Sequence, residues 1–150
     1  MSLPSCELLF ITLGSPLLVG IYQNGELKQS LSSDKSSSEA ITELLAELKK
    51  QYKIIKIIYA NGPGSFMGLK VAFVALSVFA GVYGCEFGAV SGFSLNGNAP
   101  IAAKKGFSFV LNDDKISLEP VLGVSASLPK SLKNLSISTD ALPNYVLEAV

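Results

Sequence analysis

The spacing of apolar positions changes several times along this chain, and each change predicts a new element. Glu7–Leu13, Leu17–Tyr22 and Glu26–Leu31 have the composition of strands. Asn24-Gly25 between the second and third runs predicts a tight hairpin, because a type I′ turn needs positive φ at both central residues. The chain is therefore expected to open with three antiparallel strands.

A helix is predicted after the polar connection Ser32–Ser38. Ser36 and Glu39 are spaced as in a capping box, in which a serine oxygen accepts from a free amide and the glutamate side chain reaches back. We predict a helix from Ser37 to Gln51. Its apolar positions share one face at helical spacing: Ile41, Leu44, Leu45, Leu48 and Tyr52.

A strand, a glycine-rich turn and a second helix follow. Lys53–Ala60 predicts a central strand, because its near-continuous isoleucines are typical of a strand covered on both faces. The turn from Asn61 to Ser65 reads Asn-Gly-Pro-Gly-Ser, and Met67–Tyr83 predicts a helix that ends at Gly84. Glu86–Val90 is expected to be another strand.

This second helix is apolar on nearly every side. At about 100° per residue, one broad side should cover the sheet: Val71, Ala72, Ala75, Val78, Phe79 and Val82. The opposite side carries small residues beside an aromatic and a valine: Lys70, Phe73, Val74, Ser77 and Gly81. Such a face suits the close approach of another helix, and the alternative is a cover formed by the chain's own C-terminal segment.

The C-terminal third predicts fewer regular elements. Phe93–Ala103 is expected to hold a short helix, and Phe107–Leu111 with Lys115–Leu118 a second hairpin. Leu135–Ile137 is expected to form one more strand. We therefore predict an N-terminal lobe, residues 1–95, followed by a reduced C-terminal lobe or extension, residues 96–150.

The order of the predicted elements defines the fold class. Three antiparallel strands, a helix, a strand, a helix and a strand is the order of the ribonuclease-H-like lobe in the actin/Hsp70/sugar-kinase superfamily. We predict this α/β fold with a mixed sheet. A Rossmann unit is excluded, because the glycine-rich turn does not belong to the first βα unit.

The composition favours a protein surface that a partner covers. Hydrophobic residues make up 49% of the chain and charged residues only 16%. The apolar runs are shorter than the roughly 20 residues that span a bilayer. No signal peptide is evident at the N-terminus, so we expect a cytoplasmic protein that does not contact a membrane.

The missing residue types exclude several kinds of chemistry. The chain has no histidine and no arginine, and all its cations are lysines. It therefore has no Ser-His or Cys-His couple, no imidazole metal ligand and no bidentate phosphate clamp. Cys6 and Cys85 have no metal-ligand spacing and are expected to be buried thiols. Without a basic stripe or interleaved aromatics, direct binding of RNA is not expected.

The glycine-rich turn leaves two interpretations open. Its residues and the start of the helix could bind an anion through free amides, or they could form only a tight strand-to-helix turn: Gly62, Gly64, Ser65 and Gly68. A magnesium-dependent ATPase of this superfamily needs a carboxylate on the first hairpin. No acidic residue lies between Phe10 and Gly25, and a Ser65–Lys70 peptidase couple has nothing in its favour.

The run Ala60–Lys70 resembles the Gly-Pro-Gly-Ser-Phe-Thr-Gly-Leu-Arg signature of the TsaB (YeaZ) family, formerly labelled glycoprotease-like or M22-like. The resemblance covers roughly residues 7–95. It implies a non-catalytic paralogue of TsaD, an accessory subunit that binds and activates a TsaD-like subunit. That subunit, with a TsaE-like ATPase, transfers a threonylcarbamoyl group to adenosine 37 of tRNA.

The resemblance also implies where the cofactors and partners bind. ATP and metal are expected on the partner subunit, none on this chain alone, and tRNA is contacted only indirectly. The two helices would form the partner interface, and a homodimer could use the same face: Thr42, Leu45, Ala46, Lys49, Lys70, Phe73, Val74, Ser77 and Gly81.

The sequence departs from the family pattern at three places. Thr12-Leu13-Gly14 replaces Asp-Thr-Ser, Met67 replaces threonine and Lys70 replaces arginine. The C-terminal lobe is also shorter than the family's. These departures agree with a scaffold role and argue against nucleotide binding in the chain's own cleft.

Overall fold

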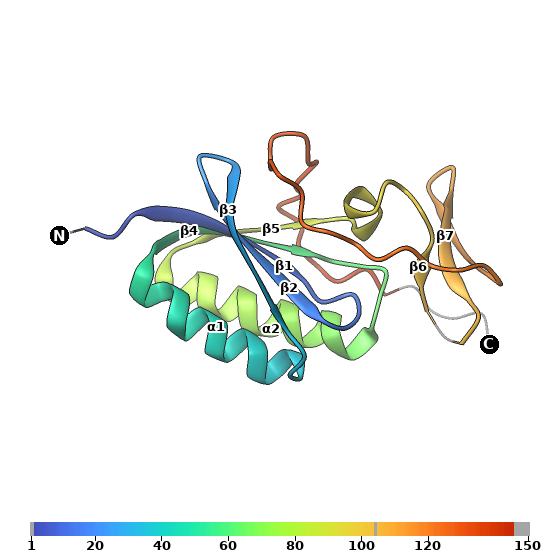
Figure 1. The fold of residues 1–150 in the computed structure, drawn as a ribbon, viewed down its shortest axis with the longest axis horizontal. Helices are drawn as coiled ribbons and strands as arrows, with labels where there is room; N and C mark the ends of the chain where they lie inside the picture. Colours follow the sequence, from blue (N-terminus) through green and yellow to red (C-terminus); the bar gives the residue numbers. More distant parts are fainter. Residues whose placement is uncertain (1, 104, 146–150) are drawn as a thin grey trace.

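The computed structural model describes residues 2–103 and 105–145 and has two layers built on a five-stranded sheet (Figure 1). The strands are arranged in the order β3-β2-β1-β4-β5, and a smaller sheet has the order β6-β7-β8. The elements are β1 Ser5–Ile11, β2 Leu17–Gln23, β3 Glu26–Ser33, α1 Ser37–Gln51, β4 Lys53–Ala60, α2 Phe66–Tyr83, β5 Glu86–Val90, the 3-10 turn Gly92–Leu95, β6 Ile101–Ala102, β7 Ser108–Asn112 and β8 Lys115–Glu119.

The predicted mixed sheet of the ribonuclease-H-like lobe is confirmed. β1, β2 and β3 form the antiparallel meander, whereas β4 pairs in parallel with β1 on one side and β5 on the other. At the first hairpin, Asn24 has φ 53° and Gly25 has φ 79°, the backbone that the Asn-Gly pair predicts.

The ends of the helices lie close to their predicted positions, but the capping box predicted at the start of α1 does not form. The Ser36 side chain makes no cap hydrogen bond, and its Oγ lies 3.5 Å from the Ser38 hydroxyl instead. In α2 the cap does form, because Ser65 Oγ accepts from the Gly68 amide at 3.1 Å. Gly84, with φ 71°, ends this helix in the left-handed conformation.

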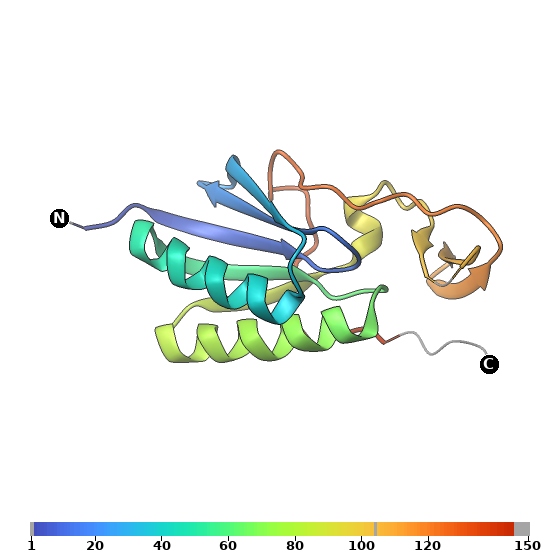
Figure 2. The same ribbon diagram turned by 60° about the horizontal axis from the view of Figure 1, so that its bottom comes forward.

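Each face of the five-stranded sheet has its own cover (Figure 2). α1 and α2 pack on one face, over side chains such as Phe10 and Ile57. The C-terminal segment passes over the other face, where Leu132, with Leu128 and Ile137 beside it, packs against Ile58 and its neighbours. This double cover explains why β4 is an almost continuous run of isoleucines.

The C-terminal predictions are confirmed only in part. The hairpin of β7 and β8 forms, but the predicted helix Phe93–Ala103 is limited to the 3-10 turn, followed by β6. Gly97 and Asn98 both have positive φ, which ends the helix there.

The predicted strand Leu135–Ile137 is wrong. The chain makes isolated bridges at the two edges of the large sheet, from Ser131 to Glu26 and from Ser138 to Ala89. Leu135 and Ile137 belong to no strand, and their partly buried side chains pack against the core. Residues 128–137 thus pack against the N-terminal sheet, and the lobe boundary at residue 95 stays a prediction.

The predicted orientation of α2 is wrong at three positions. Val78 and Val82 do not cover the sheet, since they are 60% and 69% exposed. Phe73 does face the sheet, with its ring centroid 6.4 Å from that of Tyr59 and 6.2 Å from that of Phe87. The fully buried positions of the helix are Gly68, Leu69, Ala72, Leu76 and Ala80.

α2 also has the length and the mean hydropathy of a membrane span, counting the described residues. Its buried side nevertheless packs on the sheet beside α1 (Figure 2). The high hydropathy of α2 is therefore explained by a buried side that packs in the core and an outer side that is also apolar.

Candidate functional site

A polar cleft, an apolar groove and a second apolar hollow lie along the helix layer. α1 and α2 run in the same direction, so that both begin at the polar cleft and both end beside the same apolar hollow. Between these ends, an apolar groove separates the exposed sides of the two helices. The cleft contains part of the glycine-rich turn, and the groove contains part of the predicted partner face.

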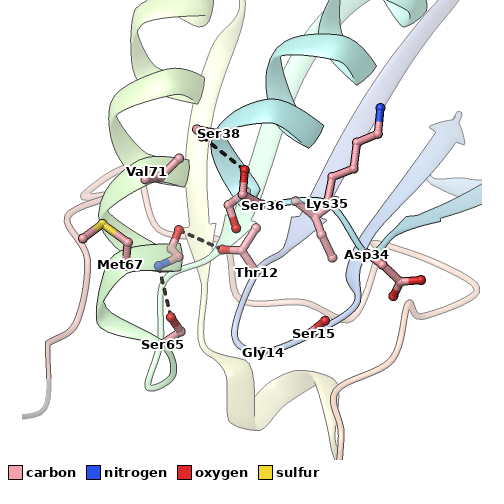
Figure 3. Close-up of a pocket in the computed structure, with 13 residues that line it drawn as sticks. Thr12, Gly14, Ser15, Asp34, Lys35, Ser36, Ser38, Ser65, Met67 and Val71 are labelled. Carbon is pink, nitrogen blue, oxygen red and sulfur yellow. Dashed lines mark hydrogen bonds between the residues drawn. The ribbon is translucent and has the colours of Figure 1, made fainter.

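The glycine-rich turn is tied closely to the end of β1. The Ser65 amide donates to the Leu13 carbonyl at 2.9 Å. The Thr12 hydroxyl donates to the Gly68 carbonyl at 3.2 Å (Figure 3). A Cβ on Gly68 would lie 2.6 Å from the Thr12 carbonyl oxygen, and one on Gly64 would lie 2.8 Å from Leu13 backbone atoms. The glycines therefore allow α2 to approach the sheet.

This geometry favours the turn interpretation over the anion interpretation. Two of the amides expected to bind an anion, those of Ser65 and Gly68, already donate within the protein. Gly62 has φ 126°, and a Cβ there would lie 2.7 Å from the Asn144 carbonyl oxygen. Its role is thus explained by backbone conformation and close packing.

The polar cleft has a volume of about 490 Å³ and opens between the first turns of the two helices (Figure 3). Its lining is mostly hydroxyl groups and small side chains: Thr12, Gly14, Ser15, Leu17, Asp34, Lys35, Ser36, Ser37, Ser38, Ser65, Met67, Gly68 and Val71. Asp34 was missed by the sequence reasoning, which searched the first hairpin for a carboxylate. It follows β3, and no sequence signal placed it in the same cleft as Ser65.

The described residues contain no candidate metal cluster and no reactive thiol. They contain no cluster of three or more His, Cys, Asp or Glu that could hold a metal ion. Burial raises the pKa of the Cys6 thiol to about 12, and burial also raises the pKa of Cys85. Both thiols are therefore protonated at neutral pH and are poor nucleophiles.

We expect the isolated chain not to hydrolyse ATP. Among the described residues that line the cleft, Asp34 is the single carboxylate. It could be a magnesium ligand, but no second carboxylate is present among them to act as a general base on the attacking water. The measurement is phosphate release with and without magnesium, and an Asp34→Asn variant serves as the control. Magnesium-dependent turnover that Asp34→Asn removes would support the ATPase interpretation.

The apolar groove has a volume of about 530 Å³ and lies between the outer sides of α1 and α2. One wall carries a row of valines at i, i+4 and i+8, in which Val74, Val78 and Val82 are 51%, 60% and 69% exposed. The complete lining is Ile41, Thr42, Leu45, Ala46, Lys49, Val74, Ala75, Val78, Phe79, Val82 and Tyr83. A row of exposed valines on a helix is unusual for a solvent-facing side.

The groove brings together only part of the predicted interface. The members that line it are Thr42, Leu45, Ala46, Lys49 and Val74. Those that do not are Lys70, Phe73, Ser77 and Gly81. Sequence reasoning missed the rest of the wall on α2, because it assigned Val78 and Val82 to the sheet. Whether these residues contact a partner stays a prediction.

Comparison with solved structures identifies the same fold in two other proteins. YeaZ from Pseudomonas aeruginosa superposes with a TM-score of 0.55 at 15% identity, covering 90% of this chain and 67% of that one. An uncharacterized protein, described as similar to peptidase YeaZ from Pseudomonas aeruginosa, gives 0.51 at 20% identity, covering 83% and 67%. No family model matches the sequence, and no curated protein matches it. The likeness shows a YeaZ-like fold.

Proposed function

We propose that this chain is a cytoplasmic accessory subunit of the TsaB type. Its groove between α1 and α2 binds helices of a TsaD-like catalytic subunit. That subunit threonylcarbamoylates adenosine 37 of tRNA with a TsaE-like ATPase. The observation that carries the proposal is the apolar groove, which exposes Val74, Val78 and Val82 on a two-helix layer. The YeaZ-like fold and the resemblance of the run Ala60–Lys70 to the TsaB signature support a TsaD-like subunit as the partner.

The energetics of the groove agree with association. Apolar surface contributes about 25 cal/mol per Å² when it is removed from water. Burial of a few hundred Å² on each subunit would thus offset much of the rigid-body entropy lost on association. The groove is already formed in the single chain, so binding requires little reordering.

Reconstitution with the purified partner tests the function. We expect the TsaD-like subunit from the same genome to co-elute with this chain in size-exclusion chromatography. We also expect modification of tRNA, measured as the modified nucleoside after digestion, to need both proteins and the TsaE-like ATPase. Separate elution, together with an unchanged modification rate when this chain is omitted, would contradict the proposal.

A further inference from the structure

The end of the groove where both helices terminate carries charge of one sign. A second apolar hollow of about 310 Å³ continues the groove there: Leu3, Lys49, Tyr52, Lys53, Ile54, Phe79 and Tyr83. Lys49, Phe79 and Tyr83 line both spaces. The described residues that line the groove and the hollow include two lysines, Lys49 and Lys53, and neither aspartate nor glutamate.

The side chain of Lys49 is held across the end of the groove. Its Nζ lies 2.9 Å from the Tyr83 hydroxyl oxygen and 4.9 Å from the centroid of the Tyr83 ring. Among the described residues, Lys49 forms no ion pair within 4.0 Å, whereas Lys50 lies 3.9 Å from Glu47 on the outer side of the helix. Both lysines occupy the last turn of α1, where their positive charge interacts favourably with the negative end of the helix dipole. Only Lys49 lines the groove.

The Lys49–Tyr83 pair leaves donors unused. Lys49 donates one of its three ammonium hydrogens to the Tyr83 oxygen, which leaves two ammonium hydrogens and the Tyr83 hydroxyl hydrogen. A carboxylate seated beside the pair could accept from both side chains, in a charge-assisted arrangement next to apolar walls. No carboxylate among the described lining residues occupies that place.

From this charge distribution we infer that the partner helix seated in the groove carries an aspartate or glutamate where its apolar stripe ends. That carboxylate binds Lys49 and Tyr83. The inference rests on the proposed function and deepens it, because it states which helix the groove selects. The row from Val74 to Val82 spans about 12 Å at 1.5 Å per residue. The selected helix therefore presents roughly two turns of apolar residues before the acidic one.

The test compares Lys49→Glu with Lys50→Glu in binding to the TsaD-like subunit. The two variants change the same charge in the same helical turn, so they perturb the helix dipole alike. We expect Lys49→Glu to raise the dissociation constant at least about tenfold, and Lys50→Glu to change it less than about twofold. Lys49→Gln should give a smaller loss and a weaker dependence of affinity on salt.

Reversal of charge on the partner identifies the carboxylate. Each exposed aspartate or glutamate beside an apolar stripe of the TsaD-like subunit is changed to lysine in turn. We expect one such variant to recover binding to Lys49→Glu. Absence of any recovery, or equal losses for Lys49→Glu and Lys50→Glu, overturns the inference.

The outcomes separate this inference from the proposed function. If Val78→Asp abolishes binding and Lys49→Glu leaves it unchanged, the proposed function stands. Only the inference of an acidic residue on the partner helix is then overturned. Absence of binding by the unmodified chain overturns both. Self-association of the chain alone is measured by light scattering. If Lys49→Glu weakens it, the groove binds a second copy of this chain, and the inference is likewise overturned.

Discussion

Val78→Asp is expected to abolish binding of the TsaD-like subunit while the isolated chain stays folded. Val78 lies in the middle of the exposed valine row and lines the groove. Burial of an unpaired carboxylate there would cost several kcal/mol, so we expect the dissociation constant to rise at least about a hundredfold, or about 2.7 kcal/mol. Titration calorimetry measures the binding, and circular dichroism of the free chain checks the fold.

Leu122→Asp is the matched control for this experiment. Leu122 is 90% exposed and does not line the groove, so the same change removes a still more accessible apolar side chain. We expect it to leave the affinity within about twofold, as for surface changes away from a contact. Equal losses for Val78→Asp and Leu122→Asp would show that general surface hydrophobicity, and not the groove, drives the association.

Gly68→Ala is expected to destabilise the chain by about 2 kcal/mol or more, in the range for overpacked sites. The added Cβ would lie 2.6 Å from the Thr12 carbonyl oxygen, which is backbone at the buried end of β1 and has little room to move. The displacement would also strain the hydrogen bond from the Thr12 hydroxyl to the Gly68 carbonyl. Urea unfolding followed by circular dichroism measures the change, because the chain has no tryptophan.

Gly81→Ala makes the same substitution in the same helix at a position with open space. Apart from the adjacent residues and the backbone of the same helix, no heavy atom of the described residues lies within 4 Å of the Cβ that it would add. Alanine is better than glycine in a helix by about 0.5–1 kcal/mol, so we expect this variant to be more stable than the original chain. A stability loss equal to that of Gly68→Ala would mean that the contact with Thr12 is not the cause.

Phe73 shows how the structure changes the choice of experiments. Its ring lies among Tyr59 and Phe87 on the core side of α2, so a charged substitution there would perturb folding as well as any interface. Ser77 is only partly buried, and its hydroxyl donates to the Val74 carbonyl within the helix. Val78 is therefore a cleaner probe of the groove than either residue.

Elements with strong local signals could be predicted with accurate bounds. α1 was predicted from Ser37 to Gln51 and β4 from Lys53 to Ala60, and the structure has both bounds unchanged. The signals were a polar start, a regular apolar stripe and a continuous isoleucine run. The Asn24-Gly25 turn and the Gly84 stop were likewise predictable, because each depends on the φ preference of one or two residues.

The orientation of α2 could not be predicted in the same way. A helical wheel needs charged or strongly polar positions to define its exposed side, and this helix has no charged residue from Val71 to Tyr83. Close packing between α2 and the sheet decided which side of the helix is buried. Gly64 and Gly68 bring the start of the helix against Thr12 and Leu13, and this contact fixes its rotation.

For residues 5–90 the sequence alone determined which segments become strands and helices, since local backbone preferences and apolar spacing specify them there. It also excluded a Ser-His or Cys-His couple and an imidazole metal ligand, because the chain has no histidine and composition does not depend on folding. Only the tertiary structure decided that Val78 and Val82 line a groove, that Lys49 reaches Tyr83 and that Asp34 lines the same cleft as Ser65. These placements depend on distances between elements far apart in the chain, which packing sets and local pattern does not.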